Sequence, residues 1–257
     1  MSTHLSDEQR RRYDRNIRIR GFGEAGQERL LDAAVLVIGA GGLGSSAILY
    51  LAAAGVGTLG IADDDVVDEA NLQRQVIHTR ADVGRLKVES ASEKVNRLDP
   101  GLRVLTHAER VVPANIAQLM TGYDFIVDCA DNAETKLLVN DACVLSGTPF
   151  CHCGVLGLSG RIMTYAPGHA CVRCVFEEPI PASAPTAADL GILGATAGAL
   201  GAMQAAEAVK FLTGVGHPIL DALLHVDLGE GSSTKINVRR DKHCQVCGTH
   251  PTITGLA

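Results

Sequence analysis

Short apolar runs alternate with amphipathic segments over the first 154 residues of the chain. The apolar runs are rich in β-branched residues and predict strands over 33–39, 58–64, 102–109, 123–131 and 148–154. The segments between them predict helices over 42–55, 83–100 and 133–147. Strands that alternate with helices in this way build a parallel sheet with right-handed crossovers.

Two further patterns lie outside this alternating region. The polar segments 5–20 and 24–32 predict N-terminal helices, the first of them capped by Ser6. After residue 154 the pattern predicts antiparallel strands within 160–168 and 223–240, an apolar helix over 195–213 and a Pro/Ala-rich loop over 177–191.

The two patterns together indicate one α/β fold. We expect a Rossmann-like, doubly wound, mostly parallel sheet that antiparallel strands continue. The chain reads as a single domain over residues 1–257, with one half over 1–154 and an antiparallel half over 155–257.

Composition and charge narrow the class of protein. The 257 residues are 46% hydrophobic and 4% aromatic, with a net charge of −6, which gives no electrostatic case for a nucleic-acid partner. The N-terminus lacks the apolar core of a signal peptide, and no apolar run reaches the roughly 20 residues that span a bilayer. We therefore expect a cytoplasmic protein with no membrane partner.

The loop after the first predicted strand reads Gly39-Ala40-Gly41-Gly42-Leu43-Gly44 and matches G-x-G-x-x-G between a strand and a helix. Glycines allow a tight turn and a close approach to phosphate, and the helix that follows offers free N–H groups to an anion. This pattern favours nucleotide binding over an empty tight turn, but it leaves open a dinucleotide or a mononucleotide.

Charged residues that follow other predicted strands distinguish the two nucleotides. Asp63 lies where a ribose-binding acid is expected, whereas Asp64 and Asp65 are typical of solvated turns. Asp131 follows the fourth strand and can meet the glycine loop in the same crevice, and Arg74 and Lys87 could bring cations there. A triphosphate with magnesium needs such cations and a spare carboxylate, whereas a hydride-transfer site does not.

Five ordered motifs carry a family resemblance: RYDRNIR (12–18), GAGGLG, NLQRQ, VGRLKVES and DCADN. From about residue 6 to 248 the chain resembles the ubiquitin-activating-enzyme-like adenylyltransferases, the ThiF/MoeB/HesA group. It is most similar to the molybdopterin-synthase and thiazole-biosynthesis members. The resemblance implies an enzyme that uses ATP and magnesium to adenylate the C-terminal glycine of a small ubiquitin-like sulfur carrier, whose tail ends in Gly-Gly.

The resemblance also implies roles for individual residues. Residues 39–44 would line the phosphate loop, with Gly39, Gly41, Gly42 and Gly44 as the glycines. Asp63 would bind the ribose, with Asp65 beside it, and Asp131 would take magnesium. The triphosphate would be contacted by Asn71, Arg74, Gln75 and Lys87. Arg15 would reach the ATP from the other subunit of a homodimer. Catalysis would rest on Arg15, Arg74, Lys87 and Asp131.

Four of the eight cysteines form two pairs, Cys171-Val-Arg-Cys174 and Cys244-Gln-Val-Cys247. Two C-x-x-C pairs complete a closed tetrahedral zinc site, which leaves no open position and is therefore structural. The alternatives are free thiols or a redox pair, and the resemblance independently implies zinc. The other four cysteines are typical of core residues: Cys129, Cys143, Cys151 and Cys153. Strand alternation turns His152 away from its neighbours Cys151 and Cys153.

A cysteine that thiazole-type members carry before the long helix is missing here. No cysteine lies between Cys174 and Cys244, and the matching position is Ala187. The chemistry should therefore stop at the acyl-adenylate, which a separate sulfur donor would attack. The alternatives are an adenylated peptide or small molecule, an NAD-dependent oxidoreductase, and an inactive module that scaffolds a partner.

Overall fold

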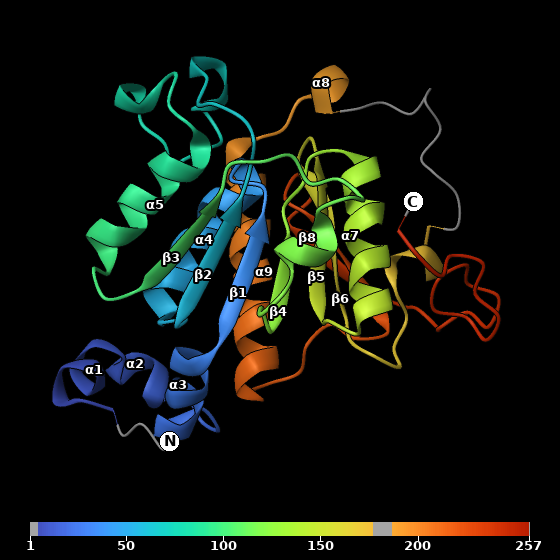
Figure 1. Cartoon of the computed structure of the whole chain (residues 1–257), viewed down its shortest axis with the longest axis horizontal. Coiled ribbons are helices and arrows are strands. Elements are labelled where there is room, and N and C mark those ends of the chain that lie inside the picture. Colours follow the sequence, from blue (N-terminus) through green and yellow to red (C-terminus); the bar gives the residue numbers. More distant parts are fainter. Residues whose placement is uncertain (1–4, 177–186, 257) are drawn as a thin grey trace.

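The computed structural model describes residues 5–176 and 187–256 and places eight strands of these residues in one sheet (Figure 1). The strand order is β3-β2-β1-β4-β5-β6-β7-β8. The strands are β1 Ala34–Ile38, β2 Thr58–Ala62, β3 Arg103–His107, β4 Phe125–Asp128, β5 Phe150–Leu156, β6 Ser159–Tyr165, β7 Ala222–Asp227 and β8 Ser232–Asn237. Strands β1 to β5 pair in parallel, whereas β5 to β8 pair antiparallel. The predicted fold class is confirmed.

Helices cover both faces of this sheet (Figure 1). They are α1 Asp7–Arg12, α2 Asp14–Ile17, α3 Gly23–Asp32, α4 Gly42–Ala54, α5 Lys87–Leu98, α6 Ile116–Leu119, α7 Ala133–Ser146, α8 Ala187–Leu190 and α9 Gly194–Thr213. Val35 and Val37 of β1 pack in one core cluster with α4, α5 and α9. Leu36 and Ile38 pack in the other with α6 and α7. A strand buried on both faces reads as a continuous apolar run, which is why the sequence predicts it so clearly.

The N-terminal segment differs from its prediction. The polar helix expected over 5–20 is two short helices that meet at Tyr13. Ser6 caps the first helix as predicted and forms a capping box with Gln9. Tyr13 is 4% exposed, and its ring packs so closely on Gly55 that a Cβ there would lie 2.5 Å from the ring. Burial of this aromatic residue, which the polar pattern does not show, coincides with the break.

Helix α9 packs along α4, although about 150 residues separate them. A Cβ on Gly201 would lie 2.1 Å from the Leu43 carbonyl oxygen, so only glycine allows this approach. A Cβ on Gly42 would lie 3.1 Å from that of Ala197. The N-terminal turns of both helices therefore lie side by side at the carboxyl edge of the sheet. Within the described ranges, no helix is long and apolar enough to cross a membrane.

Candidate functional site

The glycine loop leaves β1 at the point where the chain order of the sheet reverses. Strand β1 pairs with β2 on one side and with β4 on the other, so the loop faces the crevice where doubly wound sheets bind ligands. Gly39 has a φ of 98°, and a Cβ there would lie 2.6 Å from the Cys129 carbonyl oxygen. A Cβ on Gly44 would lie 1.9 Å from the Gly39 carbonyl oxygen. Helix α4 then begins at Gly42 without a side-chain cap, which leaves N–H groups for an anion.

Asp63 and Lys87 lie beside this loop. Asp63 follows β2, and its carboxylate accepts hydrogen bonds from the N–H groups of Ala40 (2.7 Å) and Asp65 (2.9 Å). The Lys87 Nζ lies 2.7 Å from Asp65 and 3.9 Å from Asp63, and its side chain is 6% exposed. Burial raises the pKa of Asp63, and the Lys87 charge opposes that increase. The fold thus brings a buried cation to a carboxylate that already contacts the loop.

The segment after β2 brings Asn71, Arg74 and Gln75 to the same loop. Arg74 donates to Asn71 Oδ1 at 2.7 Å, and its Cγ lies 3.5 Å from the Cβ position of Gly42. The Gln75 Nε2 lies 3.6 Å from the Cβ position of Gly41. Gln75 is 4% exposed, and its Oε1 has no partner within the described residues. A buried amide oxygen without a partner is costly, and a bound ligand that donates a hydrogen bond would satisfy it.

Asp131 occupies the other side of the crevice. It follows β4, whose end contacts Gly39 through Cys129. Its side chain is exposed and accepts a hydrogen bond from Asn132 at 3.3 Å. The carboxylate is therefore free to bind a cation at the carboxyl edge of the sheet.

A second charged cluster, which was not predicted, lies at the end of β4, three residues before Asp131 in the sequence. Asp128 is fully buried at the end of β4, with His152 Nδ1 at 2.8 Å and Lys136 Nζ at 3.4 Å. Burial alone would raise the pKa of Asp128, but Lys136 and His152 outweigh it and hold the pKa below its ordinary value. His152 therefore points to Asp128 and away from Cys151 and Cys153, as strand alternation predicts. The pairing of β4 with β5 creates this cluster, and no sequence motif indicates it.

Within a single chain, Arg15 does not lie at the glycine loop with the other predicted site residues. It lies in α2 with its side chain 89% exposed and 4.0 Å from Asp14. Its neighbour Asn16 donates to the carbonyl of Ala54 at the C-terminal end of α4. Helix α4 has 13 residues and is thus about 20 Å long, with the glycine loop at its other end. Helix α2, which carries Arg15, therefore lies at the opposite edge of the sheet from this chain's own crevice (Figure 1).

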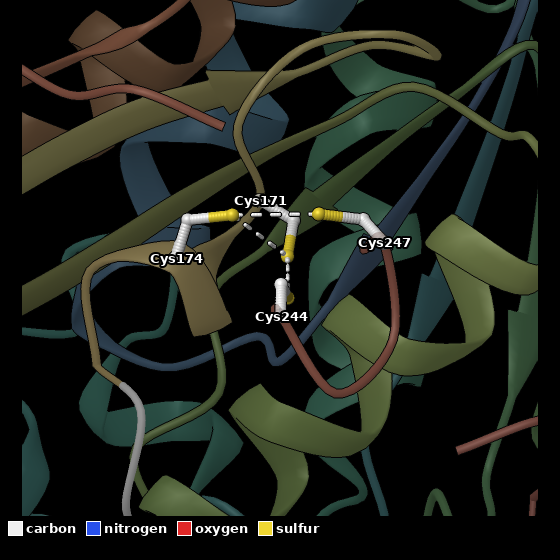
Figure 2. Close-up of side chains that lie close together, drawn as sticks. All are labelled: Cys171, Cys174, Cys244 and Cys247. Atoms are coloured by element: carbon white, nitrogen blue, oxygen red, sulfur yellow. Dashed lines mark hydrogen bonds between the residues drawn. The ribbon is translucent and has the colours of Figure 1, made fainter. Parts of the chain in front are cut away.

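The two C-x-x-C pairs meet as the spacing predicts (Figure 2). The Sγ–Sγ distances are 4.0 Å between Cys171 and Cys174, 3.6 Å between Cys171 and Cys244, and 3.4 Å between Cys174 and Cys247. Four sulfurs around a tetrahedral zinc with Zn–S bonds of about 2.3 Å are separated by about 3.8 Å. The donor set and its spacing fit structural zinc, and none of the four forms a disulfide.

Helix α7 holds the first of these pairs in place. Asn140 accepts a hydrogen bond from the Val172 N–H at 2.8 Å. Arg173 forms two hydrogen bonds of 2.7 Å with the Asp141 carboxylate. The remaining four cysteines are buried thiols, as predicted.

The predicted loop that lacks the cysteine is described only in part by the structure. Residues 177–186 of the predicted loop over 177–191 lie outside the described ranges. Ala187 begins the short helix α8, and the Gly191 carbonyl accepts a hydrogen bond from the Gly157 N–H at 2.9 Å. The chain therefore rejoins the sheet at the β5–β6 turn immediately before α9.

A glycine loop at the switch point, flanked by an acid after β2 and an acid after β4, defines the class of Rossmann-like α/β proteins with a nucleotide-type crevice. Within that class, the family model described as the ThiF family matches residues 13–248. The chain belongs to the ThiF family.

Relatives with curated names are called adenylyltransferases or activating enzymes. The chain is 44% identical over 255 residues to the bovine adenylyltransferase and sulfurtransferase MOCS3. This match covers 98% of this chain and 56% of the bovine protein. It is 45% identical to a probable adenylyltransferase/sulfurtransferase MoeZ of Mycobacterium tuberculosis, over 92% of this chain and 62% of MoeZ. It is 41% identical to a SAMP-activating enzyme E1 of Haloferax volcanii, over 96% of this chain and 92% of that enzyme. The chain thus spans little more than half of the first two relatives.

Solved structures agree on the fold. A crystal structure of E. coli MccB with AMPCPP and MccA has a TM-score of 0.79 and 25% identity, over 92% of this chain and 74% of that one. A further structure of E. coli MccB has a TM-score of 0.83 and 23% identity.

Proposed function

We propose that this protein is an ATP-dependent adenylyltransferase that activates the C-terminal glycine carboxylate of a small ubiquitin-like sulfur-carrier protein. The observation that carries the proposal is that Arg74 packs against the glycine loop, while Lys87 is held beside Asp63, whose carboxylate contacts the same loop. The named activity of the relatives supports it, above all the SAMP-activating enzyme, which matches over nearly its whole length.

The charges suit a triphosphate better than a dinucleotide. Gly39, Gly41, Gly42 and Gly44 would form the phosphate cradle, and Asp63 would bind the ribose with Asp65 beside it. Arg74 and Gln75 contact the loop itself, and Asn71 orients Arg74. Two cations near one loop supply the neutralisation that a departing pyrophosphate requires.

The reaction needs no side-chain base, because a terminal carboxylate is already ionised at neutral pH. One carboxylate oxygen forms a bond to the α-phosphorus, while the bond from that phosphorus to the β-bridging oxygen breaks. The electron pair leaves with pyrophosphate, and the product is an acyl-adenylate. Arg74 and Lys87 would hold the phosphates in line and stabilise the developing charge.

Magnesium fits the exposed carboxylate of Asp131, because carboxylate and phosphate oxygens are its usual ligands. When bound, this ion would neutralise phosphate charge. Asp131 would hold it at the carboxyl edge of the sheet, and structural zinc would occupy the four-cysteine site.

The product would be released as an acyl-adenylate to a separate sulfur donor. The chain has no cysteine between Cys174 and Cys244 that could take the acyl group. The buried thiols are poor nucleophiles, since burial raises the pKa of Cys153 to about 12 and that of Cys129 well above its ordinary value.

Carrier-dependent exchange of labelled pyrophosphate into ATP tests this proposal. Candidate carriers from the same genome that end in Gly-Gly should stimulate exchange, and intact-mass analysis should detect the acyl-AMP. The matched control is each carrier with its last two glycines removed. Exchange that only a peptide or a small carboxylate stimulates would overturn the substrate, and tight NADH binding without exchange would overturn the reaction class.

Arg15 should act on the site of the partner subunit in a homodimer, because it lies about the length of α4 from its own crevice. Arg15→Ala and Arg74→Ala homodimers should both lack exchange. When the two variants are co-expressed, half of the dimers contain one subunit of each. In such a mixed dimer one site is intact, because the Arg15→Ala subunit keeps its own Arg74 and receives Arg15 from its partner. We expect exchange to recover to about a quarter of the wild-type value.

Arg11→Ala in place of Arg15→Ala is the matched control, since Arg11 is also an exposed arginine of the N-terminal segment. It should leave the homodimer active. Mixed dimers that show no recovery, or a monomeric wild-type protein with full exchange, would contradict action in trans.

A further inference from the structure

Both backbone polar groups of Ala40, in the middle of the glycine loop, are held by side chains. Ala40 is fully buried, and its N–H donates to Asp63 Oδ2 at 2.7 Å. Its carbonyl oxygen lies 3.0 Å from Nε2 of His78. Because a carbonyl oxygen can only accept, Nε2 of His78 carries the hydrogen in this contact.

The other ring nitrogen of His78 completes a chain of hydrogen bonds. Nδ1 lies 2.9 Å from Oγ of Ser90, and that hydroxyl accepts from Lys94 Nζ at 3.1 Å. With Nε2 protonated, Nδ1 of a neutral ring accepts the hydroxyl hydrogen. His78 is 5% exposed and Ser90 fully buried, so this arrangement fixes both the tautomer and the ring orientation.

Helix α5 supports both contacts with Ala40 from one face. Lys87, Ser90 and Lys94 are spaced by three and four residues and therefore lie on the same side of the helix. Lys87 faces Asp63, which holds the N–H, and Ser90 orients His78, which holds the carbonyl.

The surroundings of the ring favour its neutral form. Burial lowers the pKa of His78, and the charges of Lys87 and Lys94 lower it further. The Ala40 carbonyl and the carboxylate of Asp82 act in the opposite direction but do not outweigh burial.

The direction of the Ala40 carbonyl determines the direction of the next N–H. In a trans peptide the C=O and the N–H point to opposite sides, so a carbonyl held toward His78 turns the Gly41 N–H toward the crevice. Among the described residues this N–H has no acceptor. A phosphate oxygen in the glycine loop is the natural acceptor.

We propose that His78 is a positioning residue for the nucleotide: by holding the Ala40 carbonyl, it aims the Gly41 N–H at a phosphate. This inference rests on the proposed function, because it assigns the loop to ATP. It predicts that replacing His78 weakens the affinity for ATP and leaves the affinity for the carrier protein unchanged.

Two variants separate the bond to Ala40 from the bond to Ser90. The amide nitrogen of His78→Gln can occupy the place of Nε2 and keep the hydrogen bond to Ala40. His78→Asn is shorter and can retain only the contact with Ser90. We expect the Gln variant to bind ATP within about threefold of wild type and the Asn variant to bind it about 10-fold more weakly.

The measurement is calorimetric titration with ATP and with AMPCPP, without carrier, alongside KM for ATP and for carrier in exchange. Zinc content and Tm check that each variant folds, and Ser90→Ala should change ATP affinity less than His78→Asn. Equal affinities in the Gln and Asn variants would overturn the role of His78. ATP binding without carrier-dependent exchange would overturn the proposed substrate and leave the His78 comparison valid, whereas a wild-type protein that binds no nucleotide would overturn both.

Discussion

Arg74→Ala should reduce carrier-dependent pyrophosphate exchange by at least about 100-fold, the scale of losing one donor from a preorganised site. Arg74 packs against Gly42 through its Cγ, and its guanidinium is oriented by Asn71, so the substitution removes a cation that the fold already holds near the glycine loop. Asp131→Asn should have an effect of the same order, because the amide is a poor substitute for a magnesium-binding carboxylate.

Arg80→Ala is the matched control for this prediction. Arg80 belongs to the same connection between β2 and α5, but it is 85% exposed and pairs with Glu69 at 2.9 Å. Its loss should leave exchange and zinc content unchanged, since exposed ion pairs contribute little. Retained exchange in Arg74→Ala and Asp131→Asn would show that the roles given to them are wrong.

Cys244→Ser should abolish zinc binding and lower Tm by more than about 10 °C, because structural zinc contributes its binding energy to folding. The site joins residues 171–174 to residues 244–247, and Cys244 is 4% exposed with its sulfur 3.6 Å from that of Cys171. Elemental analysis and thermal unfolding, both with and without a chelator, measure the two effects.

Cys153→Ala serves as the control for the loss of a cysteine. This thiol is fully buried in the other core cluster, on the face of the sheet that α4 and α9 cover. The variant should keep its zinc, and a chelator should destabilise it as it does the wild type. If the Cys153 variant lost zinc, or the Cys244 variant kept it, the four-cysteine site would not be the metal site.

Local pattern predicts the parallel part of this fold because β1 is buried on both faces and reads as one apolar run. The cysteine site was predictable for a similar reason, since the C-x-x-C spacing itself fixes ligand geometry. The break at Tyr13 was not, because it accompanies contact with Gly55, which the local pattern of polar residues does not contain.

Of the residues in and near the candidate site, some were predictable from the sequence and others were not. Motifs identify Asp63, Arg74 and Lys87, but nothing local to His78 or His152 marks either residue. The partners of these two histidines, Ala40 and Asp128, lie 38 and 24 residues away in the sequence. Only the pairing of strands and the seating of α5 bring them together.

The backbone contact between α4 and α9 also bears on how this chain can be recombined. Gly201 approaches the Leu43 carbonyl so closely that a methyl group at residue 201 would displace α4, the helix that follows the glycine loop. A genetic crossover near residue 154 would join an α4 and an α9 from different parents and disturb this fit. The two halves of the sequence should therefore be inherited together. Libraries that shuffle them should yield functional chimeras only where both parents allow the contacts of Gly201 with Leu43 and of Gly42 with Ala197.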